Sequence, residues 1–211
     1  MMRFVLAALV GVLCLHVSWA ELEAQPAGQS VLEDFTAKDA DGFPKEWKAQ
    51  HGEGKARQSY TVQLDGTQPF LAVRKADQRI YKRNISWAPK AMPVLTWRWR
   101  LKAAPAGAEP IAAVFVSLDT DLMVIPVSNK YVWSSTKAKG TTTEGGMFGA
   151  SEIILRSGPQ PIGEWIEERV NVYEDFKRIH QHEPADKAWG ISLQGGPGVE
   201  VDFGSLTVSS H

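Results

Sequence analysis

The segment TWRWRL combines aromatic and cationic side chains that could bind a ligand. Successive side chains of a β-strand point to opposite faces, so Trp97 and Trp99 share one face and Arg98 and Arg100 share the other. A leucine flanks the tryptophans on each side, and large apolar residues at this period usually point inward. We therefore expect the tryptophans in the core, rather than on an exposed platform, and the arginines on the opposite face.

Acidic residues form a second group of candidates, in the segment EWIEERVNVYEDF. Glu168 has the same parity as three β-branched residues of this segment, Ile166, Val170 and Val172, and a carboxylate on an apolar face needs a cation. We predict that Glu168 pairs with Arg98 or Arg100, beside Tyr131 and Trp133 of KYVW. A purely structural ion-pair network is the alternative. The candidate ligand-binding residues are Arg98, Arg100, Tyr131, Trp133, Glu168, Tyr173 and Asp175.

No catalytic residue is assigned. Ser157 lies outside any G-x-S-x-G motif, and no glycine-rich phosphate-binding motif is present. The carboxylates of residues 164–175 could supply the acid and the base of a glycoside hydrolase, although structural pairing explains their clustering equally well. His180 and His182 have a spacing that could hold a metal, but surface histidines after a short helix are the favoured interpretation.

A structural calcium ion is the one cofactor that the sequence suggests. Many jelly-roll modules hold calcium between their first and last strands, where this chain has Asp34 and Asp202. Calcium takes six or more oxygen ligands, so two aspartates are a weak indication.

The elements that must position these side chains are short β-type runs separated by turn signals, such as YTVQL and FLAVRK around DGTQP. The room between them is too small for crossover helices, so the strands should pair antiparallel. One short helix is expected at YEDFKRIH. The polar loop of residues 134–150 has a length that is typical of functional or mobile loops. The predicted fold is a jelly-roll-like antiparallel β-sandwich with one short helix.

The N-terminus predicts export. A positive start at Arg3 precedes an apolar stretch and then SWA, which places Ser18 and Ala20 at a small-residue cleavage site. Cys14 follows a leucine, which disfavours a lipoprotein. We expect residues 1–20 to be a signal peptide and residues 21–211 to form a single domain without cysteine, with no membrane insertion after cleavage.

The formal net charge of the 211-residue chain is -1. A near-neutral protein has no global field that attracts nucleic acid, so nucleic acid is not expected as a partner. The composition indicates no oligomeric state.

The segments LTWRWRL, KYVWSSTKAKG and LRSG followed by GEWIEERVNVYEDFKRIH resemble domain-of-unknown-function family 3047, over most of the chain after the signal peptide. Its members are mostly exported and have no assigned activity, so the resemblance implies export and a β-rich fold. Two acidic stretches of the family are replaced here by AEP and QGGPG. A site built from those acids in relatives would be missing from this chain.

Taken together, these features favour an exported, non-catalytic binding module for a carbohydrate or a cell-envelope ligand, in the periplasm or outside the cell. The alternatives are a glycan-active enzyme that uses the carboxylates of residues 164–175 and a structural envelope protein without a small ligand. The step from fold to ligand is an analogy, because fold does not determine function.

Overall fold

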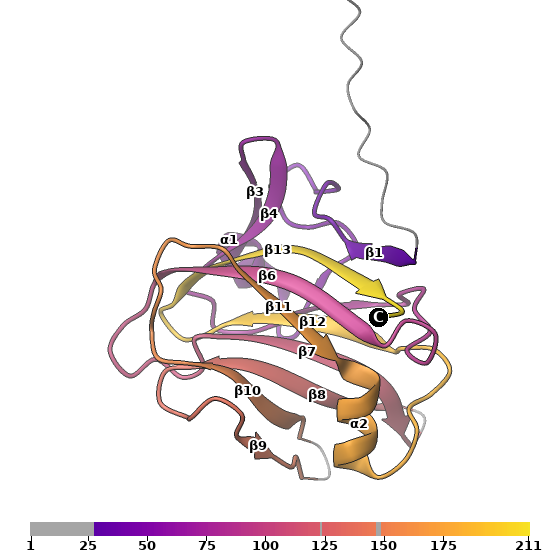
Figure 1. Cartoon of the computed structure of the whole chain (residues 1–211). Helices are drawn as coiled ribbons and strands as arrows, with labels where there is room; N and C mark the ends of the chain where they lie inside the picture. The colour runs from indigo at the N-terminus through magenta and orange to yellow at the C-terminus, as the bar shows by residue number, and fades with distance from the viewer. Residues whose placement is uncertain (1–27, 123, 147–148) are drawn as a thin grey trace, which may run out of the picture.

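The computed structural model describes residues 28–122, 124–146 and 149–211. It is a sandwich of two β-sheets packed face to face, with a helix across one open side (Figure 1). The elements are β1 (Gln29–Glu33), β2 (Lys48–Ala49), α1 (Glu53–Ser59), β3 (Tyr60–Asp65), β4 (Gln68–Arg74), β5 (Ile80–Arg83), β6 (Val94–Ala103), β7 (Ala112–Asp121), β8 (Ile125–Ser134), β9 (Thr142–Thr143), β10 (Ser151–Ser157), β11 (Ile166–Asn171), α2 (Val172–His180), β12 (Gly190–Gly195) and β13 (Glu200–Ser209).

The six-stranded sheet has the order β11-β6-β13-β4-β3, with β1 also paired to β13. The seven-stranded sheet has the order β2-β5-β12-β7-β8-β10-β9. Neighbouring strands are antiparallel except for β8 and β10, which run parallel. The predicted β-sandwich class is therefore confirmed, with this one parallel pair as an addition. Because β1 pairs with β13, the first and last described strands lie side by side (Figure 1).

The core lies between the two sheets, and the tryptophans of TWRWRL are at its centre. Trp97 is 1% exposed and Trp99 is 0% exposed. The Trp97 ring centroid lies 5.9 Å from that of Tyr131, and the Trp99 centroid lies 5.7 Å from that of Trp133. Each buried aromatic side chain removes roughly 150–250 Å² from water. The prediction that these tryptophans belong to the core is confirmed.

The predicted short helix is present as α2. The side chain of Asn171 caps it by accepting a hydrogen bond of 3.0 Å from the Glu174 backbone N–H. Phe176 and Ile179 point into the core, and the helix ends at Gln181 with a left-handed backbone. The other helix, α1, was not predicted, because Ala56 is its single buried residue and its sequence has no apolar period.

The export prediction concerns the N-terminal segment and the absence of a membrane-spanning helix after cleavage. The expected signal peptide, residues 1–20, and Cys14 lie outside the described residues. In the part of the chain that is described, none of the helices has the length and apolar character needed to cross a membrane.

Candidate functional site: a groove on the outer face of the seven-stranded sheet

Arg98 and Arg100 lie on the outer face of the six-stranded sheet, opposite the tryptophans, as the alternation predicts. Arg100 donates to Asp202 at 2.9 Å and to Asp65 at 2.8 Å. Arg98 donates to a side-chain oxygen of Gln68. Both guanidinium groups lie over the ring of Trp165, at 4.8 Å for Arg98 and 4.3 Å for Arg100. On this face Arg100 therefore has two carboxylate partners, whereas Arg98 has the Gln68 side chain and its Nε atom has no hydrogen-bond partner among the described residues.

The predicted pairing of Glu168 with Arg98 or Arg100 is wrong. Strand register places Glu168 opposite Trp97 of β6, so its side chain shares the inner face with the tryptophans and not the outer face with the arginines. Its cation is Arg156 of β10, which belongs to the other sheet. Trp99 also donates its indole N–H to Glu168, at 3.2 Å.

The remaining candidates lie elsewhere. Tyr131 and Trp133 are 0% exposed core residues and offer no surface to a ligand. Asp175, on α2, accepts a hydrogen bond of 3.1 Å from the Tyr131 hydroxyl and forms an ion pair with Arg178. Tyr173, on the same helix, is also buried. The candidate ligand-binding residues thus divide between the outer face of the six-stranded sheet, with Arg98 and Arg100, and the core together with α2, and they do not form one site.

Asp34 and Asp202 do not share a site either. Glu33, next to Asp34, pairs with Leu206 of β13, four residues along the strand from Asp202. At about 3.3 Å per residue, this separates the two aspartates by roughly 13 Å. Asp34 instead caps its own turn by accepting from Thr36 at 2.9 Å. Within the described ranges, no group of three or more His, Cys, Asp or Glu side chains has a geometry that could hold a metal ion.

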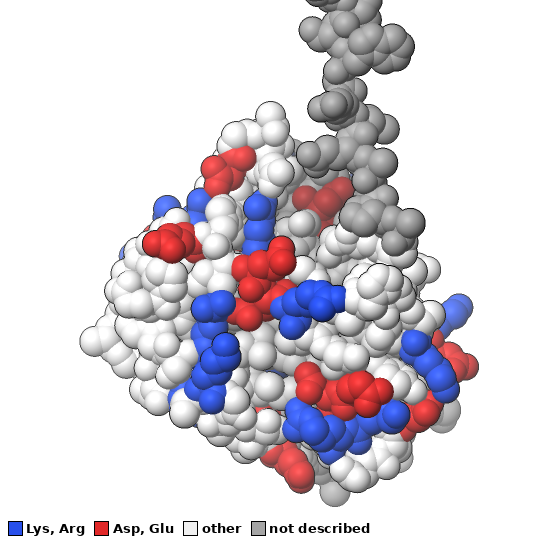
Figure 2. Space-filling model, viewed as in Figure 1, with Lys and Arg blue, Asp and Glu red and all other residues white. Residues whose placement is uncertain are grey.

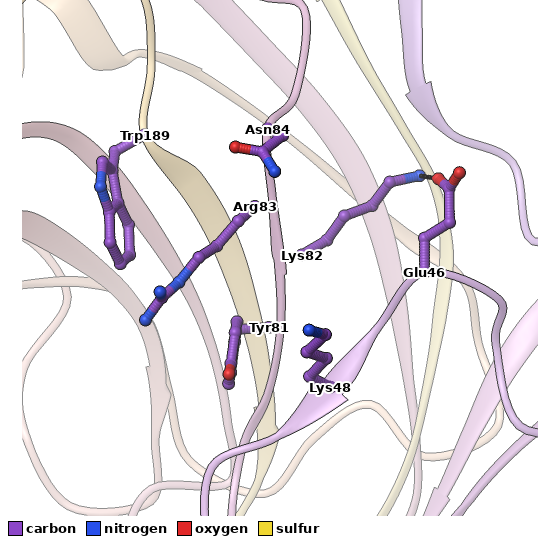
Figure 3. Close-up of a pocket in the computed structure, with 7 residues that line it drawn as sticks. All are labelled: Glu46, Lys48, Tyr81, Lys82, Arg83, Asn84 and Trp189. Atoms are coloured by element: carbon purple, nitrogen blue, oxygen red, sulfur yellow. Dashed lines mark ion pairs between the residues drawn. The ribbon is translucent and has the colours of Figure 1, made fainter.

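A groove is present on the other side of the molecule, on the outer face of the seven-stranded sheet. It consists of two adjoining hollows of about 600 and 300 Å³ that share Tyr81, Arg83 and Trp189. Figure 3 shows the residues of the larger hollow, which are Glu46, Lys48, Tyr81, Lys82, Arg83, Asn84 and Trp189. The smaller hollow adds Gln50, Arg79, Ser117, Ile125, Pro126, Ser128, Ala150 and Ser192. We call the two hollows together the outer groove.

Strand β5 and the residue before it supply the groove with side chains of one parity. Ile80 is 0% exposed and points into the core, so Arg79, Tyr81 and Arg83 point outward. Lys82 has the inward parity and binds Glu33 at 3.0 Å and Glu46 at 3.2 Å. Figure 3 shows this divergence, with Lys82 directed toward Glu46 and Arg83 directed toward Trp189.

Strand register extends the floor of the groove across the sheet. Tyr81 lies opposite Ser192 of β12, and Ser192 lies opposite Phe115 of β7. In the next row, Ser117 of β7 lies opposite Ser128 of β8, and their hydroxyl oxygens are 2.7 Å apart. The floor therefore places serine side chains beside the Tyr81 ring, in a row that also contains the buried Phe115.

Arginine side chains lie over the two aromatic rings that line the described groove, Tyr81 and Trp189, and over the buried Phe115 of the same sheet face. The Arg83 guanidinium lies 4.0 Å from the ring centroid of Trp189 and 4.9 Å from that of Tyr81 (Figure 3). The Arg79 guanidinium lies 4.6 Å from the centroid of Phe115. Burial lowers the pKa of Arg79 from its usual value, since a partly buried cation loses hydration. Such cation–π contacts orient both partners and leave the edges of the guanidinium free to donate.

The long polar loop contributes one wall. Ala150 lines the groove and packs on an apolar patch of the outer sheet face that includes Phe115. The loop is tied to β10 by hydrogen bonds from Gly140 N–H to the Ile154 carbonyl, at 2.8 Å, and from Ile154 N–H to the Thr141 carbonyl, at 2.9 Å.

One strand face of this groove could have been predicted from the sequence. RIYKR has arginine, tyrosine and arginine at every second position, so one strand face carries Arg79, Tyr81 and Arg83. A face with that composition does not suit a core and must be exposed. Trp189 could not be added in this way, because its contact with Arg83 depends on which strands are neighbours.

Charge is distributed differently in the groove and on the face shown in Figure 2. On that face acidic and basic side chains lie next to one another in mixed groups. Among the described residues, four cations line the outer groove, namely Lys48, Arg79, Lys82 and Arg83, against the single carboxylate of Glu46.

Solved structures with a similar arrangement of strands include carbohydrate-binding modules. A family 11 module from Clostridium thermocellum, in complex with a beta-1,3-1,4-mixed-linked tetrasaccharide, has a TM-score of 0.49 at 11% identity, covering 86% of this chain and 95% of its own. A variant of a family 29 carbohydrate-binding module has a TM-score of 0.40 at 13% identity, covering 87% of this chain and 93% of its own. We base the function proposed below on the groove itself and not on this likeness.

Comparison of sequences gives two results. No curated protein matches the chain. Residues 125–193, about a third of the chain, match the family described as "Protein of unknown function (DUF3047)", which confirms the resemblance over that part of the sequence.

Proposed function

We propose that the protein is an exported, non-catalytic module that binds carbohydrate in the outer groove. The observation that carries this proposal is the combination of half-buried Tyr81 and Trp189 with the hydroxyl groups of Ser117, Ser128 and Ser192. A sugar ring has an apolar face and a hydroxyl-bearing edge, which match an aromatic side chain and hydrogen-bonding groups respectively. The two volumes lie near the usual range for small-ligand sites, about 300–1,000 Å³.

The carboxylates support binding rather than hydrolysis. Glycoside hydrolysis ordinarily uses two carboxyl groups that flank the scissile bond. In the described part of the groove the lining carboxylate is Glu46, which is paired with Lys82. The acids of residues 164–175 lie elsewhere, where Glu168 is held by Arg156 and Asp175 by Arg178.

The binding prediction compares two tryptophans on opposite faces of the sandwich. Trp189 and Trp165 are both half-buried and both lie under an arginine, but only Trp189 lines the outer groove. We expect Trp189→Ala to weaken polysaccharide binding at least about tenfold, through loss of roughly 1.4 kcal/mol or more. Trp165→Ala should bind as the unaltered protein does.

The measurement is affinity electrophoresis against a panel of neutral and acidic polysaccharides, followed by calorimetric titration with any that bind. Loss of binding in Trp165→Ala with full binding in Trp189→Ala would move the site to the six-stranded sheet. Absence of binding to every polysaccharide would contradict the proposed function.

Export is tested separately. The small residues Ser18 and Ala20 before Glu21 predict cleavage at that point. Mass spectrometry of the protein recovered from outside the cytoplasm should find an N-terminus at or near Glu21. A chain that retains Cys14, with or without a lipid, would contradict the prediction.

A further inference from the structure

We propose that the outer groove selects acidic polysaccharides, in which the sugars carry carboxylate groups as in polyuronates. This inference rests on the carbohydrate-binding function and names its ligand class. It is carried by cations in the groove that have no carboxylate partner within the described residues.

Part of the positive charge in the outer groove is not neutralised by carboxylates of the described residues. Of the four lining cations, Lys82 is neutralised by Glu33 and Glu46. In the described ranges, Lys48, Arg79 and Arg83 form no ion pair within 4.0 Å. The chain as a whole has a formal net charge of -1, so this excess is local and is not a consequence of a basic composition.

Arginine lies over tryptophan on the opposite face of the sandwich as well as in the groove. There Arg100 contacts the Trp165 ring and is neutralised by Asp65 and by the fully buried Asp202. In the groove Arg83 makes the equivalent contact with Trp189 and lacks a carboxylate among the described residues. This unit is thus closed by protein carboxylates at Arg100 and left open at Arg83, while Arg98, the second arginine over Trp165, binds Gln68 and forms no ion pair among the described residues.

A partly buried cation without a counter-ion lowers the stability of the folded protein. Arg79 is partly buried against Phe115, and burial lowers its pKa. A partly buried charge without a counter-ion destabilises the folded state, whereas a bound anion offsets that cost. A guanidinium can donate two parallel hydrogen bonds to one carboxylate, which fits a uronate better than a neutral sugar.

The spacing of Arg79 and Arg83 sets a minimum length for the ligand. Arg79 and Arg83 flank Tyr81 on the same strand face and are four residues apart, which corresponds to about 13 Å. This distance exceeds one sugar ring, so a ligand that reaches both arginines must contain several sugars. Serine side chains line the floor of the groove between them.

The test uses two forms of one polymer. Calorimetric titration at low ionic strength compares polygalacturonate with the same polymer after methyl esterification, which removes the charge and keeps the sugar backbone. We expect the acid form to bind at least tenfold more tightly. The double variant Arg79→Gln and Arg83→Gln should lose this preference, and the single variant Arg83→Gln, at an exposed position, should lose most of it.

A matched variant controls for overall charge. Arg98→Gln combined with Arg169→Gln removes two positive charges from the six-stranded sheet and should retain the preference. Dextran sulfate serves as a third probe, for attraction of any polyanion. If both double variants lose affinity for polygalacturonate and dextran sulfate to the same extent, nonspecific charge attraction explains the binding and the inference fails.

The outcomes separate this inference from the function on which it rests. If both forms of the polymer bind equally and Trp189→Ala abolishes both, the groove binds carbohydrate but does not select acidic sugars. If neither form nor any neutral polysaccharide binds, the proposed function fails together with the inference. Arg79→Lys, which keeps the charge and loses the planar fork, should bind polygalacturonate more weakly than the unaltered protein if the carboxylate is held by two hydrogen bonds.

Discussion

Asp202, at the residue scale, is a fully buried carboxylate that joins three strands of one sheet. It lies on β13, and its oxygens are 2.7 Å from a guanidinium nitrogen of Arg74 on β4 and 2.9 Å from one of Arg100 on β6. The same Arg100 also binds Asp65, whose side chain is 46% exposed. Arg100 thus forms one ion pair with a buried carboxylate and one with an exposed carboxylate, so the two pairs can be compared at the same cation.

We predict that Asp202→Asn destabilises the protein by about 3–5 kcal/mol, because two arginines lose the charge that compensates their burial. Asp65→Asn should cost about 1 kcal/mol or less, as is usual for an exposed pair. Urea unfolding of the two variants measures both values. Equal losses would show that the burial of Asp202 does not determine its contribution.

Element-scale features differ in how far the sequence predicts them. The period of two in TWRWRL is a local property, and it correctly assigns Trp97 and Trp99 to the core and Arg98 to the surface. Likewise, the amphipathic pattern of YEDFKRIH correctly predicts α2. These predictions succeed because they depend on residues a few positions apart.

Pairing between strands is not local, and here the sequence was insufficient. The partner of Glu168 is Arg156, which could be identified only by knowing that β11, the edge strand of one sheet, lies near β10, the strand next to the edge of the other sheet. The groove depends in the same way on β5 and β12 being neighbours, which brings Tyr81 beside Ser192 and Arg83 beside Gly190. Parity could have identified the face of β5 but not what lies across from it.

Helix α2 contains a group that links stability to pH. His180 lies in its last turn, with its Nε2 atom 3.0 Å from the Asn129 side-chain oxygen and its ring against Phe176. Burial, and then the neighbouring His182, lowers the pKa of His180 below its usual 6.5. Above pH 6.5 both the folded and the unfolded chains leave this imidazole neutral. Below it the unfolded chain takes up the proton first, so stability falls as the pH decreases toward the folded pKa.

We therefore predict that His180→Gln makes the protein less sensitive to acid. Between about pH 7.5 and pH 5.5, the urea midpoint of the unaltered protein should decrease more than that of the variant. His51→Gln, which alters an exposed histidine outside α2, should retain the full decrease. An identical pH dependence in all three proteins would show that His180 does not contribute.

At the scale of the whole molecule, one core supports two different outer faces. Both sheets contribute to a single buried cluster that contains Trp97, Trp99, Tyr131 and Trp133. On the outer face of the six-stranded sheet Arg100 is neutralised by Asp65 and Asp202, whereas the outer groove holds Arg79 and Arg83 without carboxylate partners in the described part of the chain. Because the core is shared, a ligand that binds the folded groove stabilises the entire molecule and not one sheet alone.

This coupling gives a thermal prediction for an oligogalacturonate ligand. At a free concentration about 100 times its Kd, a ligand that binds only the folded state adds about 2.7 kcal/mol to the free energy of unfolding. For a chain of this size that corresponds to a rise in Tm of roughly 5–10 °C. The double variant Arg79→Gln and Arg83→Gln should show little or no rise at the same concentration, while Arg98→Gln with Arg169→Gln should show all of it. A rise of the same size in both variants would mean that the ligand stabilises the protein from a place other than the outer groove.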